Sequence, residues 1–582
     1  MYCVALAAII LFLASRALLK PAPPGSPSLA AKKTLLAPLL RAAAPPATME
    51  ELRAEIARAG AAGTLELDWA NRGLTALPEE IGSLTRLEKL NLAGNELSDL
   101  PEALASCTAL RTLFFLNNRF TAVPSVLGRL PALSMLSFKS NRVEHIPEDA
   151  LPPSLAWLIL TDNALAALPA ALGRLPRLRK LMLASNQLRA LPDMSGLAAL
   201  ELVRLSDNHL QEFPEALLQL PRLAWLAVAG NDFEPMPRAA VAGRLAAARS
   251  ALTMDNVQLG EVLGEGTSGV VYAAKRLDGG GSGSGGGGGE GSSGCSGQDK
   301  VAVKVFKAAS SDGRPVDEVR RQPACPGRAR GRHPSPPRPF IPPPLSPPPA
   351  ATQVAVSLAL TSPHPNLINL LGFVAEAGEG AAHYSKLASF LEFCSGMKVL
   401  AKPPSFASVT RDVYPAAPGA IQGLSVAQAG VVALAVASAA AHLHAAGVAH
   451  GDLYGHNLLL DPALVGPGAA GAGAAGALAA LAARVKLGDL GAAFFYQAGS
   501  ARGALIERVE VRAWACLAEE LLALAAPGAP AGSAEAALAA ALADLGRACG
   551  AEGGSVAARP GFAEIVDALS GPVRAAVAAA PA

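Results

Sequence analysis

Apolar positions in the first half of the chain recur at a fixed spacing of 22 or 23 residues. One copy places Leu87, Leu90, Leu92, Asn95 and Leu97 in the pattern LxxLxLxxNxL, followed by xxLPxxLxxL. The prolines in phase are Pro78, Pro101, Pro124, Pro147, Pro169, Pro192, Pro214 and Pro237, and the asparagines are Asn71, Asn95, Asn118, Asn141, Asn163, Asn186, Asn208 and Asn231. Phased copies of this kind predict a stack in which each copy contributes one short strand with inward apolar side chains.

This pattern is a leucine-rich repeat, present eight times over residues 64–237 and preceded by a cap helix predicted over 49–63. We expect each asparagine to bond the backbone of the next turn and each proline to end a return segment. The residues flanking the second strand leucine should line a concave face: Lys89, Asn91, Thr112, Phe114, Met135, Ser137, Trp157, Ile159, Lys180, Met182, Leu202, Arg204, Trp225 and Ala227. Their large apolar groups favour a protein substrate or regulator as partner, and the alternative is packing against a second domain.

The second half begins after an Ala-rich connector over 238–256 and carries a different set of motifs. They are GxGxxGxV at Gly264, Gly266, Gly269 and Val271, VAVK ending at Lys304, HPN from His364, HxDxxxxN with Asp452 and Asn457, DLG from Asp489, and RPxF from Arg559. This set, in this order, resembles the protein-kinase signature.

The resemblance extends to the intracellular leucine-rich-repeat-containing protein kinases of bacteria and algae. It rests further on WLILTDN from Trp157, PPS from Pro403 with TRD from Thr410, HGDLYGHN from His450 and ERVEVR from Glu507. It implies an α/β multidomain chain, in which the repeat solenoid precedes a bilobal kinase domain over 257–570, with a β-rich N-lobe and an α-rich C-lobe.

The resemblance also implies ATP and Mg²⁺ as cofactors, because phosphoryl transfer needs phosphate contacts, a metal and an oriented acceptor hydroxyl. The glycines Gly264, Gly266 and Gly269, with Val271 and Lys304, would bind ATP, while Asn457 and Asp489 would hold Mg²⁺. Asp452 would act on the acceptor hydroxyl. The glutamate that pairs with Lys304 is assigned to Glu318.

Three inserts interrupt this domain. The Gly/Ser tract over 279–297 and the Ala/Gly tract over 466–483 are expected at hairpin tips, away from the chemistry, because loop-closure entropy grows slowly with length. The Pro/Arg-rich segment over 320–353 falls where a kinase needs a helix, which proline at this density forbids. Residues 571–582 are expected to form a disordered tail.

The chain also departs from the kinase pattern around the candidate centre. Gly451 precedes Asp452 where many kinases carry an arginine, and Tyr454 and His456 occupy positions that usually carry a lysine or an arginine. Only about 20 residues separate Asp489 from Glu510, and the APE motif is missing.

Composition limits the remaining classes. With 582 residues the chain is too long for one core, and 49 Lys+Arg against 47 Asp+Glu give a net charge of +2, which argues against nucleic acid as partner.

Residues 1–48 are either a targeting segment or misassigned upstream sequence, because the apolar run from Val4 to Leu13 is shorter than the roughly 20 residues of a membrane span. No spanning helix is expected between repeats and kinase domain. We therefore expect a cytoplasmic protein, or alternatively one that is organelle-targeted or weakly membrane-anchored through residues 1–20.

Two functions remain after this reading. The first is an ATP-dependent protein kinase with serine or threonine as acceptor, acting in signalling, whose repeats recognise a substrate or regulator. The alternative is a pseudokinase scaffold, in which the repeats bind a protein partner and the second domain is regulatory.

Overall fold

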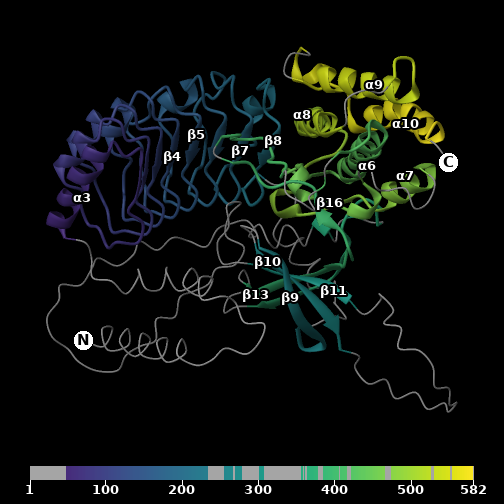
Figure 1. Cartoon of the computed structure of the whole chain (residues 1–582), viewed down its shortest axis with the longest axis horizontal. Helices are drawn as coiled ribbons and strands as arrows, with labels where there is room; N and C mark the ends of the chain where they lie inside the picture. Colours follow the sequence, from purple (N-terminus) through teal and green to yellow (C-terminus); the bar gives the residue numbers. More distant parts are fainter. Residues whose placement is uncertain are drawn as a thin grey trace. The chain divides into compact units, whose positions relative to one another are not determined.

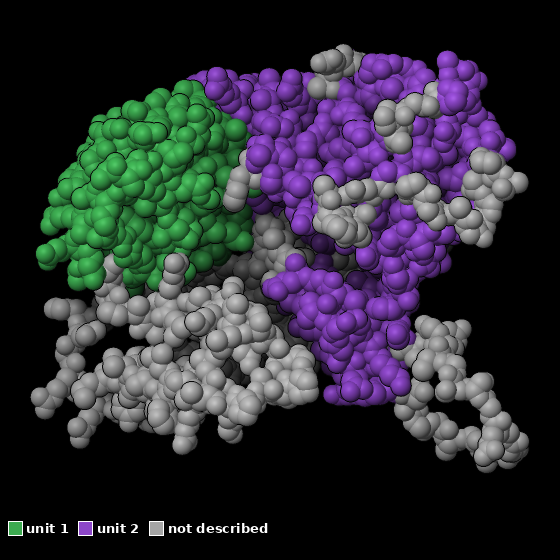
Figure 2. Space-filling model, in the orientation of Figure 1, with its two compact units in different colours: residues 1–164 green, residues 165–582 purple. Residues whose placement is uncertain are grey.

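The computed structural model describes residues 48–233, 254–265, 269–277, 300–306, 356–357, 360, 363–377, 384–405, 407–415, 421, 423–465, 474–525, 530–550 and 554–580. Four predicted features lie wholly or mainly outside these residues: Gly266, Glu318 and the inserts 279–297 and 320–353. Most of the segment 1–48 and of the connector 238–256 does so too. The chain forms two compact units, residues 1–164 and 165–582 (Figure 2).

Unit 1 begins with helix α3 (Met49–Ala62), at the place where the sequence predicts a cap helix (Figure 1). Thr48 and Glu51 form a capping box, in which the Thr48 hydroxyl accepts from the Glu51 backbone N–H at 3.2 Å and the Glu51 carboxylate accepts from the Thr48 N–H at 2.7 Å. These bonds satisfy two amide groups that the first turn of a helix cannot pair internally. The helix buries Leu52 and Ile56 against the first repeat.

Five short strands follow in unit 1, and from the second strand on each starts and ends at the flanking positions that the repeat pattern predicts. They are β1 (Glu66–Asp68), β2 (Lys89–Asn91), β3 (Thr112–Phe114), β4 (Met135–Ser137) and β5 (Trp157–Ile159), paired in parallel in chain order. The leucine at the centre of each strand from β2 to β5 is fully buried. Unit 2 continues the repeats with β6 (Lys180–Met182), β7 (Leu202–Arg204) and β8 (Trp225–Ala227), also parallel.

The prolines begin the return segments, and the expectation that they end them is wrong. Short 3₁₀ helices span Glu79–Ser83, Glu102–Ser106, Ser125–Arg129, Ala170–Arg174 and Glu215–Gln219, and each is preceded directly by a proline. Proline suits this place because its fixed φ and missing N–H cost nothing where a helix begins.

The asparagines bond backbone as expected, but their partners belong to their own repeat and the preceding one and not to the next one. In unit 2, the Asn208 amide donates to Leu183 O at 3.0 Å and to Leu205 O at 3.0 Å, and accepts from Leu188 N–H at 3.1 Å. Because one side chain satisfies three backbone groups that the narrow stack buries, the asparagine is needed in each copy.

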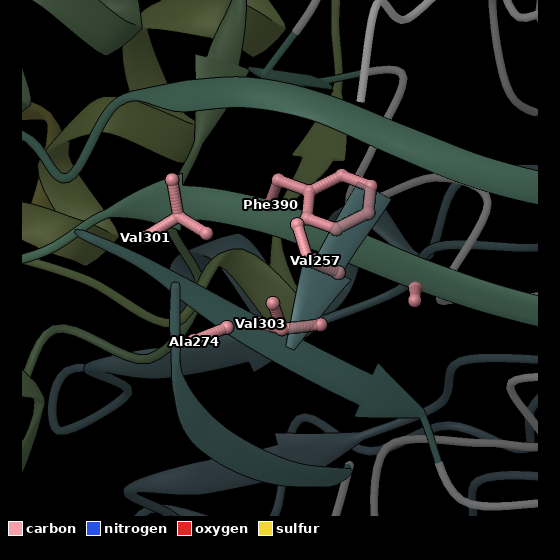
Figure 3. Close-up of a cluster of buried hydrophobic side chains, with 6 residues drawn as sticks. Val257, Ala274, Val301, Val303 and Phe390 are labelled. Carbon is pink, nitrogen blue, oxygen red and sulfur yellow. The ribbon is translucent and has the colours of Figure 1, made fainter. Parts of the chain in front are cut away.

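The region after the repeats opens with a five-stranded antiparallel sheet. Its strands are β9 (Val257–Glu265), β10 (Gly269–Arg276), β11 (Lys300–Phe306), β12 (Leu370–Ala377) and β13 (Tyr384–Glu392), in the spatial order β12-β13-β11-β10-β9. A short 3₁₀ turn at Met254–Asn256 leads into β9. Buried side chains from four strands form its core: Val257, Ala274, Val301, Val303, Ala388 and Phe390 (Figure 3).

A mostly helical part follows the sheet. Its helices are α6 (Val426–Ala445), α7 (Ala474–Ala483), α8 (Ala501–Leu524), α9 (Ala534–Ala548) and α10 (Phe562–Ala578). Its short strands are β14 (Lys398–Val399), β15 (Val448–Ala449), β16 (Leu458–Leu460), β17 (Lys486–Leu487) and β18 (Phe494–Phe495). Further 3₁₀ turns span Gly455–Asn457, Pro462–Leu464, Leu490–Ala492 and Val556–Ala558.

Helix α6 is the core helix of this part, which explains its apolar composition. By length and hydropathy it is the one helix among the described residues that could cross a membrane, but 78% of its most apolar window is buried inside the protein. The Trp514 indole of α8 donates to the Ala433 carbonyl of α6 at 2.9 Å, which fixes these two helices together.

The Ala/Gly tract over 466–483 joins the antiparallel strands β16 and β17, at a hairpin tip as the sequence predicts. It includes α7, which the sequence does not predict and which buries Leu478 and Leu481 beside α6, because alanine favours a helix even in a low-complexity run. One expected boundary is wrong. The tail expected to be disordered over 571–582 continues α10 to Ala578, with Val573 and Ala576 buried. Apolar residues at helical spacing therefore extend the folded part beyond residue 570.

Candidate functional site

Lys304 lies near the end of β11, in the middle of the antiparallel sheet. Its strand partners are Val271 on β10 and Ser389 on β13, so that Val271 and Lys304 are directly opposite each other. The lysine is 5% exposed, and its Nζ donates to Asp489 Oδ1 at 2.7 Å. The sheet thus brings the lysine to a residue that is 185 positions later in the chain.

Asp489 follows β17 and begins the turn Leu490–Ala492 with a left-handed backbone, φ 52°. Its Oδ1 also accepts from the Gly491 N–H at 3.2 Å. Partial burial acts to raise the pKa of Asp489, but the Lys304 ammonium outweighs it and holds that pKa below its usual range. Asp489 is therefore an ionised carboxylate at the protein surface.

Asp452 and Asn457 lie on the loop between β15 and β16. The Asn457 amide nitrogen donates to the Asp452 carbonyl at 2.7 Å and to its Oδ2 at 3.2 Å, which leaves the amide oxygen as an acceptor. The Asp452 N–H donates to His450 Nδ1 at 3.2 Å.

Gly488 joins the two halves of this site. Its N–H donates to the Asn457 carbonyl at 2.9 Å, and its carbonyl lies 3.0 Å from His450 Nε2. The Lys304–Asp489 pair is therefore joined to the Asn457–Asp452 pair through Gly488, which precedes Asp489 in the chain, although these residues come from three separate motifs.

The glycine hairpin is formed by β9 and β10, with Gly264 opposite Val271. A Cβ at Gly264 would meet no atom of the described residues within 4 Å, whereas one at Gly269 would lie 2.5 Å from the Val305 carbonyl oxygen. Gly264 thus borders open space, while Gly269 is required by the close approach of β11. The structure says nothing of Gly266 or Glu318, which are outside the described residues.

Glu510 of α8 is a site residue that the sequence reading did not assign. Its carboxylate accepts from the N–H groups of His450 at 3.0 Å and Gly451 at 2.6 Å, and it lies 2.7 Å from His444 Nε2. Burial acts to raise the pKa of Glu510, but these partners, His444 first, hold it below its usual range. The only sequence signal was its place in the ERVEVR motif from Glu507.

Of the two residues at positions that usually carry a lysine or an arginine, His456 is held by Asp412 and Tyr454 is buried. His456 Nδ1 lies 2.7 Å from Asp412 Oδ1, and its N–H donates to Asp412 Oδ2 at 2.8 Å. Tyr454 is 4% exposed, and its hydroxyl has no hydrogen-bond partner among the described residues. Asp412, of the TRD motif, was likewise missed as the residue that holds this loop.

The last repeats contact the same loop. The Arg204 guanidinium, on β7, donates from Nη1 to the Gly451 carbonyl at 2.8 Å and forms an ion pair with the Asp452 carboxylate. Burial acts to raise the pKa of Asp452, but Arg204 and then His456 outweigh it and hold that pKa below its usual range. Arg204 is itself 4% exposed, so this pair is largely removed from water.

Trp225 on β8 makes a second contact with the loop. Its indole N–H donates to the Leu453 carbonyl at 3.0 Å, and its ring stacks on Tyr454. Gly451 has φ +73°, and a Cβ there would lie 2.8 Å from the Leu226 carbonyl and 2.6 Å from that of Ala492. Only glycine allows the backbone of β8 to approach this closely.

Two further contacts join the repeats to the helical part. The Thr410 hydroxyl accepts from Arg179 Nη2 at 3.0 Å and donates to Glu201, and Arg559 Nη2 donates to the Pro221 carbonyl at 2.5 Å. The predicted concave positions of β6 to β8 are all buried: Lys180, Met182, Leu202, Arg204, Trp225 and Ala227. For the last repeats the structure therefore supports the second of the two alternatives, packing against the second domain.

A cavity of about 220 Å³ lies beside Asp489. Its walls are apolar and polar in similar measure, with leucines such as Leu367, Leu370 and Leu391 beside the polar residues Ser357, His364, Asn369 and Asp489. Among the described residues there is no cluster of three or more His, Cys, Asp or Glu side chains placed to hold a metal ion. Any metal at this site would depend on Asp489 and Asn457.

Comparison with known proteins identifies the repeats. Family models described as leucine rich repeat match residues 153–210 and 176–233, and a second model of that description matches residues 86–107. These parts of the chain are leucine-rich repeats. Among curated proteins, no sequence matches.

Similar solved structures include a leucine-rich-repeat protein of Leptospira interrogans, which is 31% identical over 30% of this chain and 51% of its own, with a TM-score of 0.26. A TDR receptor is 27% identical over 32% of this chain and 33% of its own, with a TM-score of 0.29. The plant peptide hormone receptor RGFR1 in complex with RGF2 is 30% identical over 28% of each chain, with a TM-score of 0.26. The chain covers about half or less of the length of each.

Proposed function

We propose that the region from residue 257 to 580 is an ATP- and Mg²⁺-dependent protein kinase, and that the repeats serve it as a recognition module. The observation that carries the proposal is the network from Lys304 through Asp489 and Gly488 to Asn457 and Asp452. A strand lysine, a turn carboxylate and a loop Asp–Asn pair have no structural need to meet, but phosphoryl transfer requires them together.

The residues present fit the proposed cofactors. An ionised carboxylate on Asp489 and the amide oxygen of Asn457 are oxygen ligands of the kind that Mg²⁺ prefers, and Lys304 beside them supplies a positive charge for phosphate. When bound, Mg²⁺–ATP would supply the phosphoryl group and neutralise its charge. The open space at Gly264 leaves the β9–β10 hairpin accessible to phosphates.

Asp452 would orient the acceptor hydroxyl and take up its proton. The Asn457 amide holds its Oδ2, and 17% of the side chain stays exposed to an incoming group. A low pKa keeps this carboxylate ionised at neutral pH, so that it can accept a hydrogen bond from a serine or threonine hydroxyl.

Protein recognition is proposed for the repeats of unit 1 that carry β2 and β3. At the flanking positions of β2 and β3, Lys89, Asn91, Thr112 and Phe114 are all partly exposed. A mixed polar and aromatic surface of this kind suits a protein substrate or regulator.

A specific observation favours the second candidate, a pseudokinase scaffold. Lys304 already pairs with Asp489, and Asp452 already pairs with Arg204, so two reactive side chains are engaged by the protein itself. In that case the domain would hold nucleotide without transferring phosphate.

Transfer and nucleotide binding can be measured separately on the full-length protein with radiolabelled ATP and Mg²⁺. We expect Asp489→Asn to abolish Mg²⁺-dependent ATP binding, and Asp452→Asn to retain binding but to lose about 10²-fold or more in transfer. Asp544→Asn, on the exposed surface of α9, is the matched control. Equal transfer by Asp452→Asn and the parent would refute the kinase proposal, and binding without transfer by the parent would establish the scaffold.

A further inference from the structure

The position before Asp452 has no side chain, yet an arginine lies against it. The Arg204 guanidinium binds two consecutive residues of the loop, the Gly451 carbonyl at 2.8 Å and the Asp452 carboxylate. A guanidinium is planar and presents its N–H groups in a fixed fork. Binding both acceptors at once therefore fixes the direction of the Asp452 side chain relative to its own backbone.

The surrounding contacts show that this place is built for the arginine. Trp225 binds Leu453 and Tyr454, and the missing Cβ of Gly451 lets the Leu226 carbonyl approach. Arg204, Trp225 and Tyr454 are each less than 5% exposed. Contacts buried to this degree are typical of a permanent interface and differ from a loosely docked surface.

We infer that Arg204 is a positioning residue for Asp452, and that the repeats that carry β7 and β8 are part of the catalytic centre as well as of the solenoid. This inference rests on the proposed kinase function. Arg204 and Asn457 hold the Asp452 carboxylate from two directions, and such preorganisation matters because a misplacement of about 1 Å can cost 10²-fold in rate.

The geometry argues against a cover that shuts the site. Asp452 keeps 17% of its side chain exposed, and Asp489 keeps 42%. Arg204 therefore approaches the loop from the side of the repeats, and the carboxylates of Asp452 and Asp489 stay accessible from a different side.

The test compares Arg204→Gln and Arg204→Lys in the full-length protein, with Arg502→Gln as control. Arg502 also joins the repeats to α8, through Glu215, but both side chains are more than half exposed. We expect Arg204→Gln to lower kcat about tenfold or more while KM for ATP stays within about twofold, and Arg204→Lys to restore part of the loss. A folded Arg204→Gln variant whose kcat is unchanged or higher would overturn the inference, and an increase would identify the repeats as an inhibitory cover.

Hydrogen exchange of the loop amides separates this inference from the proposed function. Arg204→Gln should speed exchange at residues 451–457 about tenfold, and Arg502→Gln should leave it unchanged. If the parent transfers no phosphate, the kinase proposal fails, whereas unchanged exchange in Arg204→Gln refutes the positioning role by itself. If Arg204→Gln gives no cooperative melt, kcat and loop exchange are measured on Arg204→Lys, which keeps the charge and loses the planar fork of the guanidinium. Parent values of both in Arg204→Lys would then overturn the inference.

Discussion

Trp225 and Tyr454 stack face to face, with ring centroids 4.3 Å apart and planes only 3° from parallel. One ring belongs to a repeat strand and the other to the loop that carries Asp452. Both are almost fully buried, so this pair contributes apolar burial as well as a stacking preference of about 0.5–1.5 kcal/mol. The loop is thereby tied to the repeats by an apolar contact beside the Arg204 ion pair.

Substitution of Trp225 should loosen this connection. We expect Trp225→Ala to lower the free energy of unfolding by about 3–5 kcal/mol, because it leaves a cavity against Tyr454. Trp225→Phe should lower it less, because phenylalanine keeps an aromatic ring against Tyr454. The remaining loss includes the hydrogen bond to Leu453 O, worth about 1 kcal/mol. Urea unfolding followed by circular dichroism measures both, and equal stability of the two variants would contradict the stacking argument.

Gly451 and Gly499 provide a matched pair for backbone crowding. Both have φ +73°, but a Cβ at Gly451 would lie 2.6 Å from a carbonyl, whereas one at Gly499 would meet nothing within 4 Å. Gly499→Ala should therefore lower the free energy of unfolding by only about 1–2 kcal/mol, which is the cost of a left-handed backbone for alanine. Gly451→Ala should lower it clearly more. Thermal melts of the two variants give the difference, and equal losses would show that neither the Ala492 nor the Leu226 carbonyl is in close contact with Gly451.

Phosphorylation between Gly491 and Glu507 should not be required for activity. Tyr496 donates or accepts a bond with His444 Nδ1 at 2.7 Å, and Ser500 caps α8 by accepting from the Gly503 N–H at 2.9 Å. We predict that phosphatase-treated protein and a Tyr496→Phe, Ser500→Ala variant each keep transfer within about tenfold of the parent. The variant should still lose about 1 kcal/mol of stability through the cap. A larger loss of transfer in either sample would show that one of these hydroxyls is a regulatory acceptor.

Glu520 should make stability fall as pH rises. Burial first, and Asp412 in addition, raise the pKa of Glu520 from 4.5 to about 7, although the Tyr414 hydroxyl donates to it at 2.8 Å. Because the folded pKa exceeds the unfolded one, the proton contributes stability that is complete below about pH 4.5 and is lost as pH rises through about 7.

The variant that tests this is Glu520→Gln, which stays neutral at every pH. We expect it to be more stable than the parent at pH 8 by about 1–3 kcal/mol, and to flatten the decline between pH 4.5 and 7. Glu519→Gln, with 47% of the side chain exposed, is the control. A parent whose stability rises steadily over this range, with no difference in Glu520→Gln, would contradict the assignment.

The sequence predicted the repeat strands to the residue, because a three-residue strand that buries one leucine leaves no freedom in register. It also selected Lys304, Asp452, Asn457 and Asp489, which the fold brings into one network. It could not show what Arg204 and Trp225 contact. Their place beside the strand leucines predicts a surface position, but the partner depends on packing between segments more than 220 residues apart.

The errors of the sequence reading have similar physical causes. The sequence does not predict the helix at 474–483 in the β16–β17 connection, because composition does not reveal that a neighbouring helix offers an apolar surface. Glu510 and Asp412 were missed because a buried carboxylate that holds backbone N–H groups has no spacing signature of its own.

The boundary between the two compact units falls between Ala164 and Leu165, inside the row of repeats. The position of this boundary has a consequence for how the number of repeats can change during evolution. Duplication or loss of a repeat upstream of residue 165 leaves the bonds of Arg204, Trp225 and Pro221 intact, whereas the same event downstream removes or shifts at least one of them. Among related chains, repeat number should therefore vary toward the N-terminus, while the last three copies stay fixed in number and register and are inherited together with the loop they hold.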